Sequence, residues 1–132
     1  MNLAIITSND IYRESLKTAL NQITRFKVRL ECHNCSETLQ QIAGRKIDVV
    51  LLTSADCGDD LGRTLKRLHQ LVPGVKILML LDHPEECWRT QAISSGADDA
   101  IPQYADKDAL EEHICRLSQM REHTTKWRKI LK

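Results

Sequence analysis

The sequence has few aromatic residues, no long apolar run and almost no net charge. Aromatic side chains make up 4% of the 132 residues against 42% for all hydrophobic types, which predicts one compact domain with an aliphatic core. No segment approaches the roughly 18 apolar residues of a membrane span, and the N-terminus lacks the basic start and apolar stretch of a signal peptide. A formal net charge of +1 favours neither nucleic acid nor a membrane as partner. We therefore expect a cytoplasmic protein without membrane contacts.

The charge is nevertheless distributed unevenly. From Arg121 onward the chain has five basic residues and a single acidic one, so the preceding part is mildly acidic. Such a run is usually a solvated helix end or a linker, although basic residues around Trp127 could also contact nucleic acid or an acidic partner. The twelve residues after Met120 are too few for a helix-turn-helix, so DNA would be bound only through a separate output domain outside this chain. We divide the chain into one domain over residues 1–119 and a basic C-terminal helix extension or linker over residues 120–132.

Cysteine occurs in an odd number, five, which fits a disulfide framework poorly. Cys32 and Cys35 form a CxxC pair at the start of a predicted helix, where the helix dipole favours a thiolate. A metal or redox site would combine this pair with residues of nearby loops: Cys57, His83 and Cys87. One CxxC pair without a second is a weak zinc signal, so we expect no metal and no cofactor.

Strand-like and helix-like patterns alternate five times along the chain. Short apolar or alternating runs predict strands near residues 3–6, 28–30, 47–52, 75–81 and 100–101. Apolar residues at helical spacing predict helices over 12–23, 35–43, 61–72, 84–95 and 110–117, with Trp88 and Ala92 on the same face of the fourth. Strands that alternate with helices form parallel sheets with right-handed crossovers. We therefore predict an α/β fold, a flavodoxin-like doubly wound five-stranded sheet in the order 2-1-3-4-5.

The strand over residues 47–52 is the most informative of the five. Its uninterrupted apolar run predicts a strand that is buried on both faces. In doubly wound sheets the carboxyl ends of such strands face the crevice that holds the functional site. The residue at that point is Thr53, a neutral hydroxyl, so the predicted site has no carboxylate there.

Four segments, in this order, resemble the receiver domain of bacterial response regulators, which is CheY-like. They are YRESL at 12–16, DVVLL at 48–52, VKILML at 75–80 and AISSGAD at 92–98. The pattern is most like that of receivers that precede a NarL/LuxR-type DNA-binding domain, and it covers roughly residues 3–119. The resemblance implies the receiver fold and a role in two-component phosphorelay signalling.

Receivers of this family phosphorylate an aspartate that ends the third strand, and they hold Mg²⁺ with that aspartate and an acidic pair after the first strand. A Ser or Thr after the fourth strand and a lysine after the fifth complete the site. An aromatic residue on the fifth strand takes part in the conformational switch. The matching positions of this chain carry none of these groups. Thr53 lies at the acceptor position, and Thr7 and Ser8 lie at the positions of the acidic pair. Leu81 replaces the Ser or Thr, Gln103 replaces the lysine, and Ala100 replaces the aromatic residue.

These departures change the functional expectation. Mg²⁺ requires anionic oxygen ligands, and an acyl phosphate forms on a carboxylate, not on an unactivated threonine. We therefore interpret the chain as a degenerate receiver, or pseudo-receiver, and not as an enzyme. It would act through contact with a protein partner or through pairing with a second copy of itself.

Two other interpretations stay open. Aspartates in the loops after strands one, three and four could form a displaced carboxylate cluster that still binds a cation and accepts a phosphoryl group: Asp10, Asp56, Asp59, Asp60 and Asp82. Loop aspartates more often cap helices or lie in solvent. The other alternative is a metal or redox sensor built on the cysteine set described above.

Overall fold

The computed structural model describes the backbone of residues 1–56, 60–83 and 85–131, and the side chains of residues 1–55, 60–83 and 85–119. Strands and helices alternate along the chain. The strands are β1 (Asn2–Ile6), β2 (Lys27–Cys32), β3 (Val49–Thr53), β4 (Lys76–Leu81) and β5 (Asp99–Pro102). The helices are α1 (Asp10–Asn21), α2 (Cys35–Gln41), α3 (Leu61–Leu71), α4 (Glu86–Ser94) and α5 (Lys107–Leu131), and the short 3-10 helix η1 (Ser54–Asp56) follows β3.

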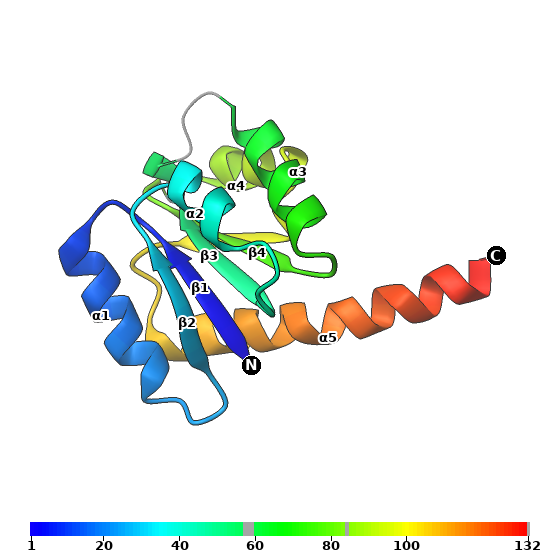
Figure 1. Ribbon diagram of the computed structural model, residues 1–132, viewed down its shortest axis with the longest axis horizontal. Coiled ribbons are helices and arrows are strands. Elements are labelled where there is room, and N and C mark those ends of the chain that lie inside the picture. Colours follow the sequence, from blue (N-terminus) through cyan, green and yellow to red (C-terminus); the bar gives the residue numbers. More distant parts are fainter. Residues whose placement is uncertain (57–59, 84, 132) are drawn as a thin grey trace.

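The five strands form one parallel sheet in the order β2-β1-β3-β4-β5, as Figure 1 shows. This confirms the predicted flavodoxin-like fold and its strand order. The order places β3 at the centre of the sheet with β1 and β4 beside it, and leaves β2 and β5 at the edges. The carboxyl ends of all five strands therefore meet at one edge of the sheet.

Both faces of the sheet are covered by helices, which explains the continuous apolar runs of the central strands. Alternate side chains of a strand point to opposite faces. In β3, Val50 and Leu52 join the core under α2, α3 and α4, whereas Val49 and Leu51 join the core under α1 and α5. A strand buried on both faces needs apolar residues at every position, so its sequence cannot alternate with polar residues.

The fourth helix differs from its prediction. Ala92 packs into the core, but Trp88 is 43% exposed and its ring stacks on the ring of His83, with 4.9 Å between the ring centroids. Trp88 lies in the first turn of α4, two residues after its start at Glu86. Pro84, predicted as an early residue of this helix, lies outside the described residues, and α4 begins at Glu86.

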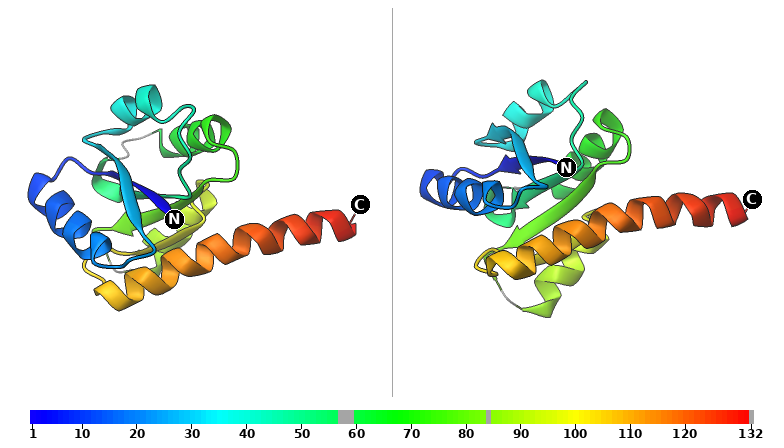
Figure 2. Two further views of the ribbon diagram at one scale, coloured as in Figure 1. Left: turned by 60° about the horizontal axis from the view of Figure 1, so that its bottom comes forward. Right: turned by 90° about the horizontal axis from the view of Figure 1, so that it is seen from below.

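The last helix is long and extends beyond the sheet (Figures 1 and 2). Its predicted inner positions, Leu110, Ile114 and Leu117, are buried against the sheet. The same helix continues to Leu131, and the side chains of its basic C-terminal part lie outside the described residues. None of the helices, as far as they are described, combines the length and the apolar character that a membrane crossing needs.

Candidate functional site

The structure brings the positions singled out by the family resemblance to one edge of the sheet. Thr7 follows β1, Thr53 and Leu81 end β3 and β4, and Gln103 follows β5. The Thr53 hydroxyl donates to the carbonyl oxygen of Ile6 at 3.4 Å, and the backbone N–H of Gln103 donates to the carbonyl oxygen of Leu81 at 2.8 Å. Hydrogen bonds thus join the end of β1 to β3 and the end of β4 to the residue after β5.

The two threonines at this edge are buried and bonded to the local backbone. Thr7 is 1% exposed and its hydroxyl accepts from the amide of Asn9 at 3.3 Å, which helps to form the turn into α1. Thr53 is 4% exposed. Together with Ser8, which is exposed, they supply neutral hydroxyl oxygens. Mg²⁺ needs anionic ligands to offset its dehydration, so these residues do not fit the cation that receivers use.

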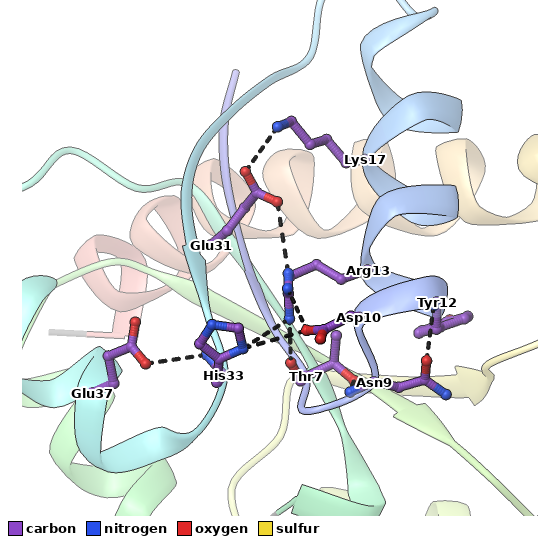
Figure 3. A network of polar contacts seen from close by, with 9 residues as sticks. All are labelled: Thr7, Asn9, Asp10, Tyr12, Arg13, Lys17, Glu31, His33 and Glu37. Atoms are coloured by element: carbon purple, nitrogen blue, oxygen red, sulfur yellow. Dashed lines mark hydrogen bonds and ion pairs between the residues drawn. The ribbon is translucent and has the colours of Figure 1, made fainter.

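A guanidinium from α1 lies against the end of β1 (Figure 3). Arg13 donates to the carbonyl oxygen of Thr7 at 3.0 Å and to the carboxylate of Asp10 at 2.6 Å. The same side chain, which is largely buried, lies 3.8 Å from Glu31 on β2 and 3.1 Å from a ring nitrogen of His33. Arg13 therefore forms an ion-pair network with Asp10 and Glu31 at this end of the sheet.

Sequence reasoning missed this network, because Arg13 reads there only as a polar position of an amphipathic helix. A weak signal existed. Asp10 and Arg13 are spaced i, i+3 at the start of a predicted helix, and residues with this spacing are neighbours on the helix surface. The pairing also changes the role of Asp10, which was a candidate cation ligand and is an ion-pair partner of Arg13.

Among the other loop acids, those whose side chains are described form no cluster around Thr53. Asp82 accepts a hydrogen bond of 2.7 Å from the Ser54 hydroxyl, and this bond lowers the pKa of Asp82. The bond joins the loops after β3 and β4. Asp60 precedes α3 without a side-chain capping bond, and Asp59 and the side chain of Asp56 lie outside the described residues. Within the described parts of the chain, no three His, Cys, Asp or Glu side chains are grouped to hold a metal.

The four described cysteines lie in different environments. Cys32 ends β2 and is buried in the core, and this burial raises the pKa of its thiol, although a hydrogen bond with Thr38 opposes the shift. A protonated, buried thiol is a poor nucleophile and a poor metal ligand. Cys35 is partly buried in the first turn of α2, as predicted, while Cys87 is exposed on α4. Cys57 lies outside the described residues.

This arrangement predicts that folding is independent of metal. The aliphatic core on both sheet faces supplies the stabilisation, so the melting temperature should be the same, within error, with and without a chelator. The measurement is metal content by mass spectrometry together with thermal unfolding in both conditions. Stoichiometric zinc, or a melting temperature that drops on chelation, would revive the cysteine-site interpretation, including a role for Cys57.

A second ionic cluster joins α4, β5 and α5. Asp99 on β5 is 7% exposed and accepts from Arg89 of α4 at 3.0 Å, while its second oxygen lies 2.7 Å from the ring nitrogen Nδ1 of His113 on α5. Burial opposes ionisation of Asp99, but the hydrogen bonds from His113, the Ala100 amide and Arg89 outweigh it and lower the pKa of Asp99. The cluster thus fixes two helices to the edge strand with one carboxylate.

Comparisons with known proteins agree with the fold. No family model matches the chain. The transcriptional regulatory protein DegU of Brevibacillus brevis is 24% identical over 119 residues, which are 90% of this chain. The chain spans about half the length of this curated relative.

Solved receiver structures superpose over most of the chain. The signal receiver domain of the putative response regulator NarL from Mycobacterium tuberculosis has a TM-score of 0.77 at 19% identity, covering 89% of this chain and 95% of that one. CheY6 of R. sphaeroides, solved in complex with the P1 domain of CheA3, has a TM-score of 0.77 at 20% identity over 88% of this chain and 95% of that one. The chain therefore has the receiver fold of CheY-like response regulators, and its sequence is similar to that of a transcriptional regulator of this kind.

Proposed function

We propose that the chain is the receiver-like domain of a two-component response regulator, and that it signals through protein contact and not through phosphorylation or other catalysis. The observation that carries this proposal is the environment of Thr53. Its hydroxyl lies at the end of β3, is bonded to the carbonyl of Ile6, and has neutral hydroxyls at the positions of the acidic pair. The chemistry that an acyl phosphate requires is not supplied by these side chains.

The surroundings of Thr53 support the same reading. Arg13 holds the Asp10 carboxylate in an ion pair of 2.6 Å, so this acid would have to give up the pair before it could bind a divalent cation. Leu81 gives no hydroxyl after β4, and Gln103 gives no positive charge after β5. Several residues that receivers use for phosphorylation are therefore replaced together. A change in the rate of the reaction would require fewer replacements.

The partner that we propose is a protein. CheY6, which has the same fold, was solved in complex with a domain of CheA3, and DegU is a transcriptional regulator. We propose that the surface of α4, β5 and α5 contacts another protein or a second copy of the chain, and α4 contributes two exposed apolar side chains to it, Ile93 at 39% and Trp88 at 43%. DNA would be reached only through an output domain outside residues 1–132, with residues 120–132 as the connection.

The direct test is exposure to small phosphodonors. Incubation with acetyl phosphate and Mg²⁺, or with beryllofluoride and Mg²⁺, should give no phosphoryl adduct by intact mass and no shifts of amide resonances near Thr53. A receiver domain with an intact acidic pair and acceptor aspartate, treated in parallel, shows that the donor is active. A stoichiometric adduct on this chain would contradict the proposal and favour the displaced aspartates instead.

A further inference from the structure

We propose that the groove between α2 and α3 is a docking site for an acidic helical segment of a partner protein that inserts an aliphatic side chain beside Leu39. This inference rests on the proposed function, because it adds a second contact surface to that of α4, β5 and α5 and gives the chemistry of the partner that it would bind. In Figures 1 and 2 the two helices lie side by side on the same face of the sheet. The open cavity between them has a volume of about 560 Å³, which is within the range of ligand-binding pockets.

The α3 side of the groove is a basic stripe. Arg63, Lys66, Arg67 and Gln70 line the cavity and are spaced i, i+3, i+4 and i+7, so they follow one side of the helix. The opposite side of α3, with Leu65 and Leu68, packs into the core. The basic stripe is therefore not needed to hold α3 on the sheet.

The charges of this stripe have no partners within the described part of the chain. Neither Arg63 nor Arg67 takes part in any ion pair or side-chain hydrogen bond there, whereas each of the other arginines with a described side chain contacts a polar group: Arg13, Arg25, Arg29, Arg45, Arg89 and Arg116. Lys66 likewise has no such partner among the described side chains. One carboxylate, that of Asp60, lines the N-terminal end of the groove. Three cations against one anion leave a positive potential over the cavity.

The apolar floor of the groove indicates which kind of anionic partner fits it. Leu39 of α2 lines the cavity and packs against the core below it. An apolar floor flanked by guanidinium groups suits a segment with an aliphatic side chain between carboxylates, since arginine binds carboxylates in a bidentate way. The phosphate backbone of a nucleic acid could pair with the basic stripe, but it has no aliphatic side chain for the apolar floor. The observations thus favour an acidic protein segment.

The stripe also sets the length of the partner. The eleven residues of α3 correspond to a helix about 16 Å long, which is three turns. A partner helix with acidic residues at i, i+3, i+4 and i+7 and a leucine between them would match the charges along this length. Such helix-in-groove binding is a common mode of peptide recognition.

The test uses a synthetic peptide of about 14 residues, helical by design, with glutamates at i, i+3, i+4 and i+7 and a central leucine. Added to the full chain and followed by amide resonances, it should shift residues of α2 and α3 and bind more weakly as salt is raised. The double variant Lys66→Glu with Arg67→Glu should lose at least about tenfold in affinity. The matched control, Lys27→Glu with Lys46→Glu, changes the same charge on a different surface and should keep the affinity within about twofold.

Other outcomes would overturn the inference. Shifts spread over the whole surface, equal losses in both double variants, or no binding at millimolar peptide would each show that the groove is not a site for such segments. Equal competition by single-stranded DNA would show a general anion surface. The phosphodonor experiment tests the proposed function separately. If the peptide does not bind and no phosphoryl adduct forms, the groove is not a docking site but the proposed function stands. If an adduct forms, the proposed function is wrong, whether or not the peptide binds.

Discussion

The variant Asp99→Ala is expected to lower the free energy of unfolding by about 2 to 4 kcal/mol. The Asp99 carboxylate accepts hydrogen bonds from three donors that belong to α4, β5 and α5. Alanine would leave the Arg89 guanidinium, the Ala100 amide and the His113 ring without this acceptor, and the Ala100 amide has no access to water in its place. The partial exposure of Arg89 keeps the loss below that of a fully buried ion pair. Chemical denaturation at neutral pH measures the change.

The matched variant Asp99→Asn separates the charge from the hydrogen bonds. Its amide oxygen can still accept from Arg89 and Ala100, and its amide group can donate to a neutral His113 ring, so the loss should be smaller than for alanine. The pH dependence gives a second check. Because the folded-state pKa of Asp99 is lowered, its contribution is present above the unfolded pKa of about 3.9 and disappears as pH falls through the folded pKa. The difference between the native chain and Asp99→Ala should therefore shrink below about pH 4. A difference that stays constant into acid would contradict the assigned role.

The strand order and the core follow from the sequence because they depend on residue patterns that few folds satisfy together. The run at 47–52 is apolar at every position, and such a strand must be covered on both faces. The stripe with Leu16 and Leu20 gives one helix that covers such a face, and the short loops between elements leave little choice of connection. The prediction of inward positions in the last helix held for the same reason, since burial of a leucine stripe follows directly from its spacing.

The polar contacts of the site were much less predictable. The network around Arg13 joins α1 to β2, and the contact of Asp99 with Arg89 and His113 joins three elements. Such contacts depend on rotamers and on the distance between elements, and neither has a periodic signature in the chain. Trp88 shows the same limit, because helical spacing places it on the face of Ala92 but does not show that it is 43% exposed while Ala92 is buried. The sequence was enough to place Thr7, Thr53, Leu81 and Gln103 at one edge of the sheet. It was not enough to predict which charged side chains form ion pairs with one another.

The second large effect is expected from Thr53→Asp, which places the receiver's acceptor residue at the end of β3. The native hydroxyl donates to the carbonyl oxygen of Ile6, and a carboxylate has no proton to donate there. The new charge would also be desolvated, because Thr53 is buried. An incompletely compensated polar group of this kind costs about 1 to 3 kcal/mol, and desolvation would raise the pKa of the introduced carboxyl. Unfolding by denaturant at neutral pH measures the loss, which should decrease as the pH is lowered and the carboxyl becomes protonated.

The same variant is expected not to regain phosphorylation, because Thr7 and Ser8 still provide no metal-binding carboxylates and Gln103 provides no positive charge. The control Thr53→Asn has nearly the same size without the charge, so the difference between the two variants isolates the electrostatic cost. If Thr53→Asp binds Mg²⁺ and takes up a phosphoryl group from acetyl phosphate, the carboxylates that hold the cation must be those of nearby loops. Asp10 would then have to exchange Arg13 for the cation, and the loss of the 2.6 Å ion pair between them would be visible as a change in the resonances of the Arg13 side chain.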